Sequence, residues 1–214
     1  LLGRITVDDV MDKVRDSSER DYQLASGLSH DVESDDKLFA QTKARLPWLL
    51  IGMIGGLCNS FILGKFEGGF VVDPALALFI PLIGGTGGNV GTQSSAIVVQ
   101  GLANGSLDIR KSTRQLLKEL GVGLVNGGII ALLVFIYNYF TIGQGHEVTT
   151  FAVSISLFCV VMFASVFGTF VPLTLEKLKI DPALATGPFI SITNDIIGML
   201  IYMTISTWLI IAFH

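Results

Sequence analysis

Long apolar runs alternate with short polar connections along most of this chain. The runs predict five membrane-spanning helices, at about 47–64, within 74–107, and at about 120–140, 151–174 and 183–212. Each is long enough for a bilayer, which needs roughly 17–25 helical residues. The second run stays uncharged for longer than that and contains Pro81 and many glycines. We therefore expect a kinked or interrupted helix there.

Residues 1–45 have the pattern of an aqueous segment. Ile5 to Met11 predicts a short strand leading into a helix that Thr6 or Asp8 would cap. One face of this helix is apolar, with Val7, Val10, Met11 and Val14, and the others are acidic, with Asp8, Asp9, Asp12, Asp16 and Glu19. These carboxylates indicate either a solvated surface or ligands for a divalent cation. After a turn-rich break, a second helix runs from about Asp35 into the first span, where Pro47 suits helix position N1.

Composition supports a membrane protein. Half of the residues are hydrophobic, 15% are charged, and 24 of the 214 are glycine, whereas soluble domains carry about 25% charged residues. We predict an all-α polytopic membrane protein with five transmembrane helices and a pseudo-symmetric repeat, preceded by a cytosolic amphipathic helix. Cys58 and Cys159 lie within apolar runs and are interpreted as small buried hydrophobes. A start at Leu1 instead of a methionine suggests a piece of a longer protein.

The charges of the connections predict the orientation. Two connections, 103–119 and 175–182, are basic, with Arg110, Lys111, Arg114, Lys118, Lys177 and Lys179. The connections at 65–73 and 141–150 contain Lys65 as their one Lys or Arg. Because cytoplasmic loops are enriched in Lys and Arg, the N-terminus and both basic connections should be cytoplasmic and the C-terminus outside. We expect a multi-pass protein of a bacterial-type plasma membrane.

A short motif occurs twice. Val-Asp-Pro-Ala-Leu-Ala at 72–77 returns as Ile-Asp-Pro-Ala-Leu-Ala at 180–185. Aspartate before proline is a helix-start pattern, so both spans should begin sharply there. With the predicted orientation, the copies start on opposite sides, as in an inverted repeat whose interrupted spans meet at a midplane site. A chance match of six residues is the alternative.

Asp195 is the one charge in the last span. A helix starting near Ala183 would place it roughly 18 Å in, near the middle of a ~30 Å hydrocarbon core. Ionisable groups at depth usually face a bundle interior, a water-filled cavity or a permeation path. The alternative is a packing hydrogen bond or a protonated carboxyl. An aspartyl protease would need two carboxylates in one site, and we expect only Asp195 at depth.

The second span contains Gly-Gly-Thr-Gly-Gly-Asn-Val-Gly-Thr-Gln-Ser-Ser at 84–95. It lacks the Lys-Ser/Thr of a P-loop and the third glycine of a dinucleotide fingerprint. In hydrocarbon it can serve helix packing, or supply neutral oxygens from uncovered carbonyls and from Asn89, Thr92, Gln93 and Ser94. Neutral oxygens beside one carboxylate suit Mg²⁺, which dehydrates reluctantly and is usually held through its waters.

These segments carry a family resemblance. The glycine-rich run at 84–95 and Asp-Pro-Ala-Leu-Ala-Thr-Gly-Pro-Phe-Ile-Ser-Ile-Thr-Asn-Asp-Ile-Ile-Gly at 181–198 resemble the signature segments of the MgtE family of magnesium channels. Residues 1–14 resemble the closing strand and helix of a CBS-domain pair. The resemblance implies a cytosolic end of a CBS domain and plug helix at 1–45, and a five-helix pore domain at 46–214. It also implies a homodimer with its pore at the subunit interface, closed by cytosolic Mg²⁺. Gating should be compromised here because most of the CBS pair is missing.

A metal site follows from the same resemblance. Asp195 matches the pore aspartate that holds the hydrated ion, Gly85, Gly88 and Ser191 match positions that offer carbonyls, and Thr92 and Gly187 match pore-lining positions. We add Asn89, as a neutral side-chain oxygen, to these expected metal-site residues. Some relatives have asparagine at the positions of Thr92 and Gly187, so this chain offers fewer amides to the ion.

The expected function is that of a magnesium-selective channel subunit, which is not an enzyme. Mg²⁺ would be both the transported and a regulatory ion, and other divalent cations and membrane lipid are further expected partners, with no nucleic acid. A proton- or sodium-coupled divalent-cation exchanger is the alternative, because interrupted, repeat-related spans also suit alternating access.

Overall fold

A computed structural model describes residues 3, 5–29, 32–108, 112–141, 146–185 and 187–213, without the side chains of 70–72 and 185. The described residues form helices and no strand. The elements are α1 (Val7–Ala25), α2 (Leu38–Lys65), α3 (Glu67–Val72), the 3₁₀ turn η1 (Pro74–Phe79), α4 (Ile80–Ala103), α5 (Ser112–Thr141), α6 (Glu147–Lys177), the 3₁₀ turn η3 (Pro182–Ala185) and α7 (Pro188–Phe213). Five segments are long and apolar enough to cross a membrane, counting η1 with α4. The predicted all-α fold with five spans is confirmed.

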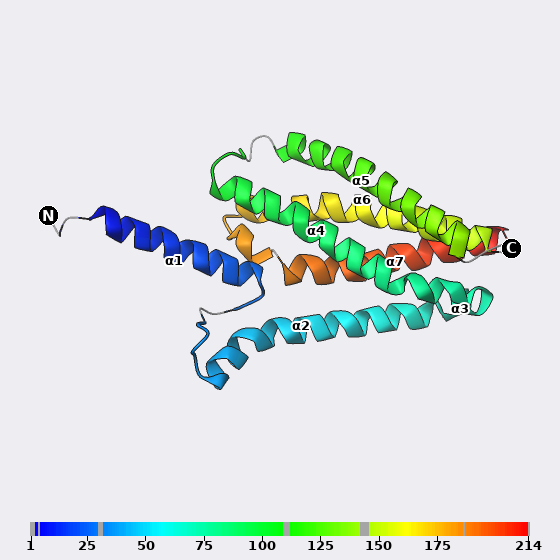
Figure 1. Ribbon diagram of the computed structural model, residues 1–214, viewed down its shortest axis with the longest axis horizontal. Coiled ribbons are helices and arrows are strands. Elements are labelled where there is room, and N and C mark those ends of the chain that lie inside the picture. Colours follow the sequence, from blue (N-terminus) through cyan, green and yellow to red (C-terminus); the bar gives the residue numbers. More distant parts are fainter. Residues whose placement is uncertain are drawn as a thin grey trace.

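The spanning helices alternate in direction, and α6 lies at the centre (Figure 1). It packs against α4, α5 and α7, while α2 packs along α7. The end of α4, the start of α5, the end of α6 and the start of α7 lie together at the end from which α1 projects, which we call the α1 end. At the opposite end lie α3, η1, the start of α6 and the end of α7. The basic side chains Arg114, Lys118, Lys177 and Lys179 are therefore near the α1 end, while Arg110 and Lys111 lie outside the described residues.

The core is built around α6. Leu157, Val160 and Val161 of α6 are fully buried against Ile83 of α4 and Tyr202 of α7. In lipid, close packing, more than the hydrophobic effect, holds helices together, and small residues allow it. Accordingly, Gly168 of α6 lies so close to Gly91 of α4 that a side chain at Gly168 would collide with the Gly91 carbonyl. The glycine-rich run thus serves helix packing at one of its faces.

The two cysteines differ in burial. Cys58 of α2 is exposed and Cys159 of α6 is partly buried, and both are free thiols. The prediction that both are buried is therefore wrong for Cys58, because α2 contacts the bundle along α7 and leaves its other faces uncovered within one chain.

Two details near the N-terminus differ from the sequence prediction. Val7 to Met11 form the first turns of α1, so the predicted strand is wrong; no second strand is present among the described residues to pair with it. Thr6 caps α1, with a reciprocal capping box to Asp9. The Asp9 carboxylate also accepts hydrogen bonds from the Thr6 hydroxyl and the Thr6 amide, and these bonds lower the pKa of Asp9. Also, α2 starts at Leu38 and runs through Pro47, which is not at N1. The Lys43 carbonyl therefore loses its usual helical partner.

The two Asp-Pro-Ala-Leu-Ala segments form the same local structure. Asp73 Oδ1 accepts the Ala75 amide at 2.9 Å, and Asp181 Oδ1 accepts the Ala183 amide at 2.9 Å. Both segments turn as 3₁₀ helix before the α-helix begins. The predicted interruption of the second span is therefore a 3₁₀ start, and the last span begins in the same way.

Candidate functional site

Asp195 lies on the face of α7 that meets α4. It is the eighth residue of α7, about 11 Å from the start at Pro188 at ~1.5 Å per residue. The predicted 18 Å assumes one continuous helix from Ala183, whereas the last span begins with η3 and a turn before α7. The side chain is half-buried, and its Oδ1 atom is buried without a hydrogen-bond partner in the described part of the chain. A buried anionic oxygen that lacks a donor is a candidate cation ligand.

Gly88 of α4 brings the glycine-rich run directly to Asp195. A Cβ on Gly88 would lie 2.8 Å from Asp195 Oδ1 and 2.7 Å from Ser191 Oγ. Any side chain at this position would push the α7 oxygens away. The structure therefore brings together three of the predicted metal residues, Gly88, Ser191 and Asp195.

Thr92 lies one turn beyond Gly88. Its hydroxyl donates a hydrogen bond of 2.8 Å to the Gly88 carbonyl. The Gly88 carbonyl, which the family resemblance assigns as a ligand, is thus already engaged with a local donor. The lone pairs of the Thr92 hydroxyl remain available as neutral oxygen.

Asn194 is a neighbour of the site that is not among the predicted metal residues. It is 1% exposed, and neither amide atom has a hydrogen-bond partner within the described ranges. A side chain at Gly91 would collide with this amide, and a Cβ on Gly87 would lie 3.6 Å from the Asn194 carbonyl oxygen. Asn194 therefore packs into α4 while the adjacent Asp195 faces Gly88. In the sequence, the position of Asn194 directly before Asp195 was the signal that it lies close to the site.

Gly85 and Asn89 lie on another face of α4. Both are exposed, as is Gln93 one turn further, and a Cβ on Gly85 would have no neighbour within 4 Å. Gly85 and Asn89, two of the expected metal residues, are therefore exposed within one chain instead of enclosed with Asp195. A polar stripe on a membrane helix is costly against lipid and usually faces a cavity or another protein surface.

Gly187 lies at the turn before α7 and has φ of +58°, a conformation that favours glycine. A side chain there would collide with the carbonyl of Ala25, the last residue of α1. Gly27 similarly approaches Pro188, with a Cβ position 2.6 Å from Pro188 Cγ. The end of α1 thus rests on the start of the helix that carries Asp195.

Glu119 of α5 is a further carboxylate that the bundle encloses, although the sequence prediction leaves it outside the spans. Glu119 is 6% exposed, and it accepts a 2.6 Å hydrogen bond from Ser94 of α4. The sequence prediction begins the third span at about 120 and leaves Glu119 in the basic connection, whereas α5 begins at Ser112. Leu116, Leu117 and Leu120 around it were the overlooked signal for an earlier helix start.

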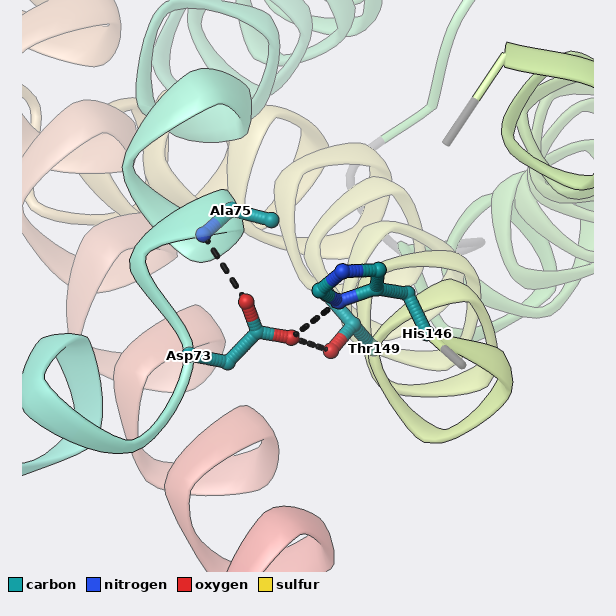
Figure 2. A network of polar contacts seen from close by, with 4 residues as sticks. All are labelled: Asp73, Ala75, His146 and Thr149. Carbon is teal, nitrogen blue, oxygen red and sulfur yellow. Dashed lines mark hydrogen bonds and ion pairs between the residues drawn. The ribbon is translucent and has the colours of Figure 1, made fainter. Parts of the chain in front are cut away.

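The opposite end of the bundle holds a polar network centred on Asp73 (Figure 2). Asp73 Oδ2 accepts a hydrogen bond from the Thr149 hydroxyl and lies 3.1 Å from His146 Nδ1, while Oδ1 accepts the Ala75 amide. Burial raises the pKa of Asp73, but the bonds from Thr149, Ala75 and His146 outweigh it and lower the pKa below its usual value. Tyr202 of α7 also donates a 2.7 Å hydrogen bond to the Leu76 carbonyl. The start of the second span is thereby fixed to α6 and α7.

No group of three or more His, Cys, Asp or Glu side chains that could hold a metal ion is found in the described residues. A cation at Asp195 would therefore have one carboxylate from this chain, hydroxyl and carbonyl oxygens, and water. This donor set fits a hard cation that keeps part of its hydration shell.

Comparison with known proteins gives consistent results. A family model described as MgtE, divalent cation transporter, matches residues 80–205. The magnesium transporter MgtE of Bacillus subtilis (strain 168) is 36% identical over 207 residues, covering 97% of this chain and 46% of the relative. Its counterpart in Thermus thermophilus is 35% identical over 214 residues, covering 99% and 47%, and that of Enterococcus faecalis is 34% identical over 207 residues, covering 97% and 45%. The chain spans about half the length of these curated relatives.

Proposed function

This chain belongs to the MgtE family of divalent cation transporters, and we propose from this premise that it carries Mg²⁺ across the membrane as one subunit of a dimeric channel. The relatives are named magnesium transporters. The observation that carries the proposal is the position of Asp195, whose buried Oδ1 lies against Gly88 and Ser191 without a protein donor in the described residues.

The ion would pass with much of its water shell. Mg²⁺ binds at one or two carboxylates and keeps several waters, because it dehydrates reluctantly. One Asp195 per chain, with Thr92 and Ser191 hydroxyls nearby, supports outer-shell contact instead of a closed protein cage. Weak, water-mediated binding also allows the ion to leave, as conduction requires. Other divalent cations with a similar hydration shell would share this path.

A second copy of the chain would complete the pore. Gly85, Asn89 and Gln93 form an exposed polar stripe on α4, and a two-fold axis along this stripe would face it with its own copy. Two Asp195 carboxylates would then balance one dication. Exposed apolar residues of α2 and α5, such as Leu57, Phe61, Leu132 and Leu133, remain for lipid or further subunit contact.

Regulation would act through α1. In the proposed orientation the α1 end is cytoplasmic and the C-terminus is outside, because the described basic side chains of both connections, Arg114, Lys118, Lys177 and Lys179, lie near the α1 end. Residues 1–45 would be the end of a CBS domain and the plug helix, and 46–214 the pore domain. Cytosolic Mg²⁺ bound by acidic residues such as Asp8, Asp9 and Asp12 would hold α1 against Gly187 and Pro188, closing the pore below Asp195.

The test is Mg²⁺ flux into liposomes reconstituted with purified protein. Asp195→Asn and Asp195→Ala should remove the flux while the thermal unfolding profile in detergent persists. Asp181→Asn is the matched control, because Asp181 is exposed and asparagine can keep its helix cap. Mg²⁺ flux equal to that of the wild type in both Asp195 variants would contradict the proposal.

The alternative, a proton- or sodium-coupled divalent-cation exchanger, is favoured by the buried carboxylate of Glu119 and by the 3₁₀ interruptions at η1 and η3. An exchanger differs from a channel in the ion gradient that drives transport. A channel carries Mg²⁺ down its own gradient in sodium-free liposomes without a pH difference, whereas an exchanger requires the counter-ion.

A further inference from the structure

We propose that Glu119, Ser94 and Thr169 form a second cation site, which takes a monovalent cation, Na⁺, at the junction of α4, α5 and α6. The site goes beyond the proposed pore, because it is enclosed within one chain and contains none of the residues that the proposed function places on the Mg²⁺ path; Ser94, a candidate oxygen in the sequence, is bonded to Glu119 instead. Its first element is the 2.6 Å hydrogen bond that Ser94 Oγ donates to Glu119 Oε1. Ser94 is 4% exposed and Glu119 6% exposed.

Thr169 of α6 joins this pair through the register of α5 and α6. A Cβ on Gly123 of α5 would lie 3.2 Å from Ser165 Cβ of α6. The two helices are antiparallel, so one turn toward the α1 end the facing residues are Glu119 and Thr169. Thr169 is fully buried, and its Oγ1 has no hydrogen-bond partner in the described part of the chain. By this register, the unsatisfied hydroxyl of Thr169 belongs to the face of α6 that meets the Glu119 level of α5.

The charge balance points to a small monovalent ion. Within the described residues Glu119 forms no ion pair, and a buried carboxylate without a compensating charge is costly. One negative charge with hydroxyl oxygens matches the charge of Na⁺ and the oxygen preference of a hard cation. Ser94 donates its proton to Glu119, so the lone pairs of its oxygen stay free. Mg²⁺ fits less well, since it demands near-octahedral geometry and usually keeps several waters.

The site is separate from Asp195. Ser94 lies six residues beyond Gly88, about 9 Å further along α4 at ~1.5 Å per residue. It also faces α5 instead of α7. Sodium at this site would link Ser94 of α4 to Glu119 of α5 and Thr169 of α6. Mg²⁺ at Asp195 would not compete with it directly.

The experiment is thermal unfolding of the purified protein in detergent, titrated with NaCl against choline chloride at constant ionic strength and without Mg²⁺. Wild type should show a saturable, sodium-specific rise in Tm. Glu119→Gln should abolish the rise, and Thr169→Val should weaken the apparent sodium affinity about tenfold, as expected for loss of one charge-linked oxygen contact. Asp195→Asn should keep the sodium response even if its Mg²⁺ flux is lost, so failures of the two proposals remain distinguishable.

Thr174→Val is the matched control for Thr169→Val. Thr174 lies on the same helix, but its exposed hydroxyl donates to the Phe170 carbonyl, so its removal should leave the sodium response unchanged. If Glu119→Gln does not fold, Thr169→Val and its control still decide the matter. The proposal is overturned if the wild-type Tm is the same in sodium and in choline, even if that Tm changes with pH. It is also overturned if Thr169→Val leaves the apparent sodium affinity unchanged.

Discussion

The two Asp-Pro-Ala-Leu-Ala segments share a sequence and a turn but have opposite surroundings. Asp73 is 8% exposed and adds contacts with Thr149 of α6 and with His146, which directly precedes α6, to its cap bond. Asp181 is exposed, and among the described residues it makes the cap bond to Ala183 without a comparable network. The comparison separates two contributions. Aspartate before proline sets the turn locally, and the packed neighbours determine whether that turn becomes an anchor.

The two turns also join their helices differently. η1 continues directly into α4 at Ile80, whereas Gly187, with positive φ, separates η3 from α7. The end of α1 contacts this second turn and does not reach the first. We therefore expect the Asp73 end to be the fixed end of the bundle, and the Asp181 end to be the one that α1 can hold or release.

The largest difference between the copies should appear on removing each aspartate. Asp73→Ala leaves the Ala75 amide and the Thr149 hydroxyl without their acceptor and should destabilise the protein by about 2–4 kcal/mol. Asp181→Ala loses one cap and should cost only about 1 kcal/mol. Denaturant unfolding in detergent measures both values. Equal losses would mean that the Asp73 network contributes nothing beyond its cap.

Gly187→Ala should have the next largest effect. It should weaken the contact between the end of α1 and the turn before α7 more than it lowers the stability of the whole protein. The left-handed backbone costs about 1–2 kcal/mol for alanine, and the new methyl group would collide with the Ala25 carbonyl and displace α1. Hydrogen exchange of the last turn of α1 should increase. Gly105→Ala is the control, because φ is +63° there and the Cβ position has open space. The same increase in both variants would contradict a direct contact between α1 and the turn.

The smallest expected difference is in acid stability. Because the folded-state pKa of Asp73 is lowered from 3.8, its contribution is present above 3.8 and is lost as the pH falls through the folded value. Wild type should therefore lose Tm more steeply than Asp73→Asn as the pH falls below about 4. Asp181→Asn should follow wild type. Parallel curves for wild type and Asp73→Asn would place the acid sensitivity elsewhere.

Local signals predicted much of the fold. The apolar runs indicate the five spans, Asp73 and Asp181 mark the span starts, and a charge within the last span identifies Asp195. The approach of the glycine-rich run to Asp195 is also predictable, because uncovered carbonyls and neutral oxygens are suitable neighbours for a carboxylate that binds a cation.

Features set by tertiary contacts were not predicted. The strand at residue 5 would need a partner that sequence alone cannot supply. Asn89 looks buried by composition, but the direction of α4 relative to α7 leaves it exposed. Glu119 looks like part of a basic connection, and only the packing of α5 against α6 and the hydrogen bond from Ser94 of α4 show that it is enclosed. The orientation in the membrane stays a prediction from the positions of basic residues.

The central claim is that Asp195 holds a hydrated divalent cation on a path shared by two copies of the chain. The most direct measurement is anomalous scattering from crystals of the protein in which Mn²⁺ replaces Mg²⁺. The predicted result is a peak beside Asp195, on a two-fold axis and separated from the carboxylate by a water layer, that disappears in Asp195→Asn. A peak that persists in that variant, or strong peaks only at other sites, would contradict the claim.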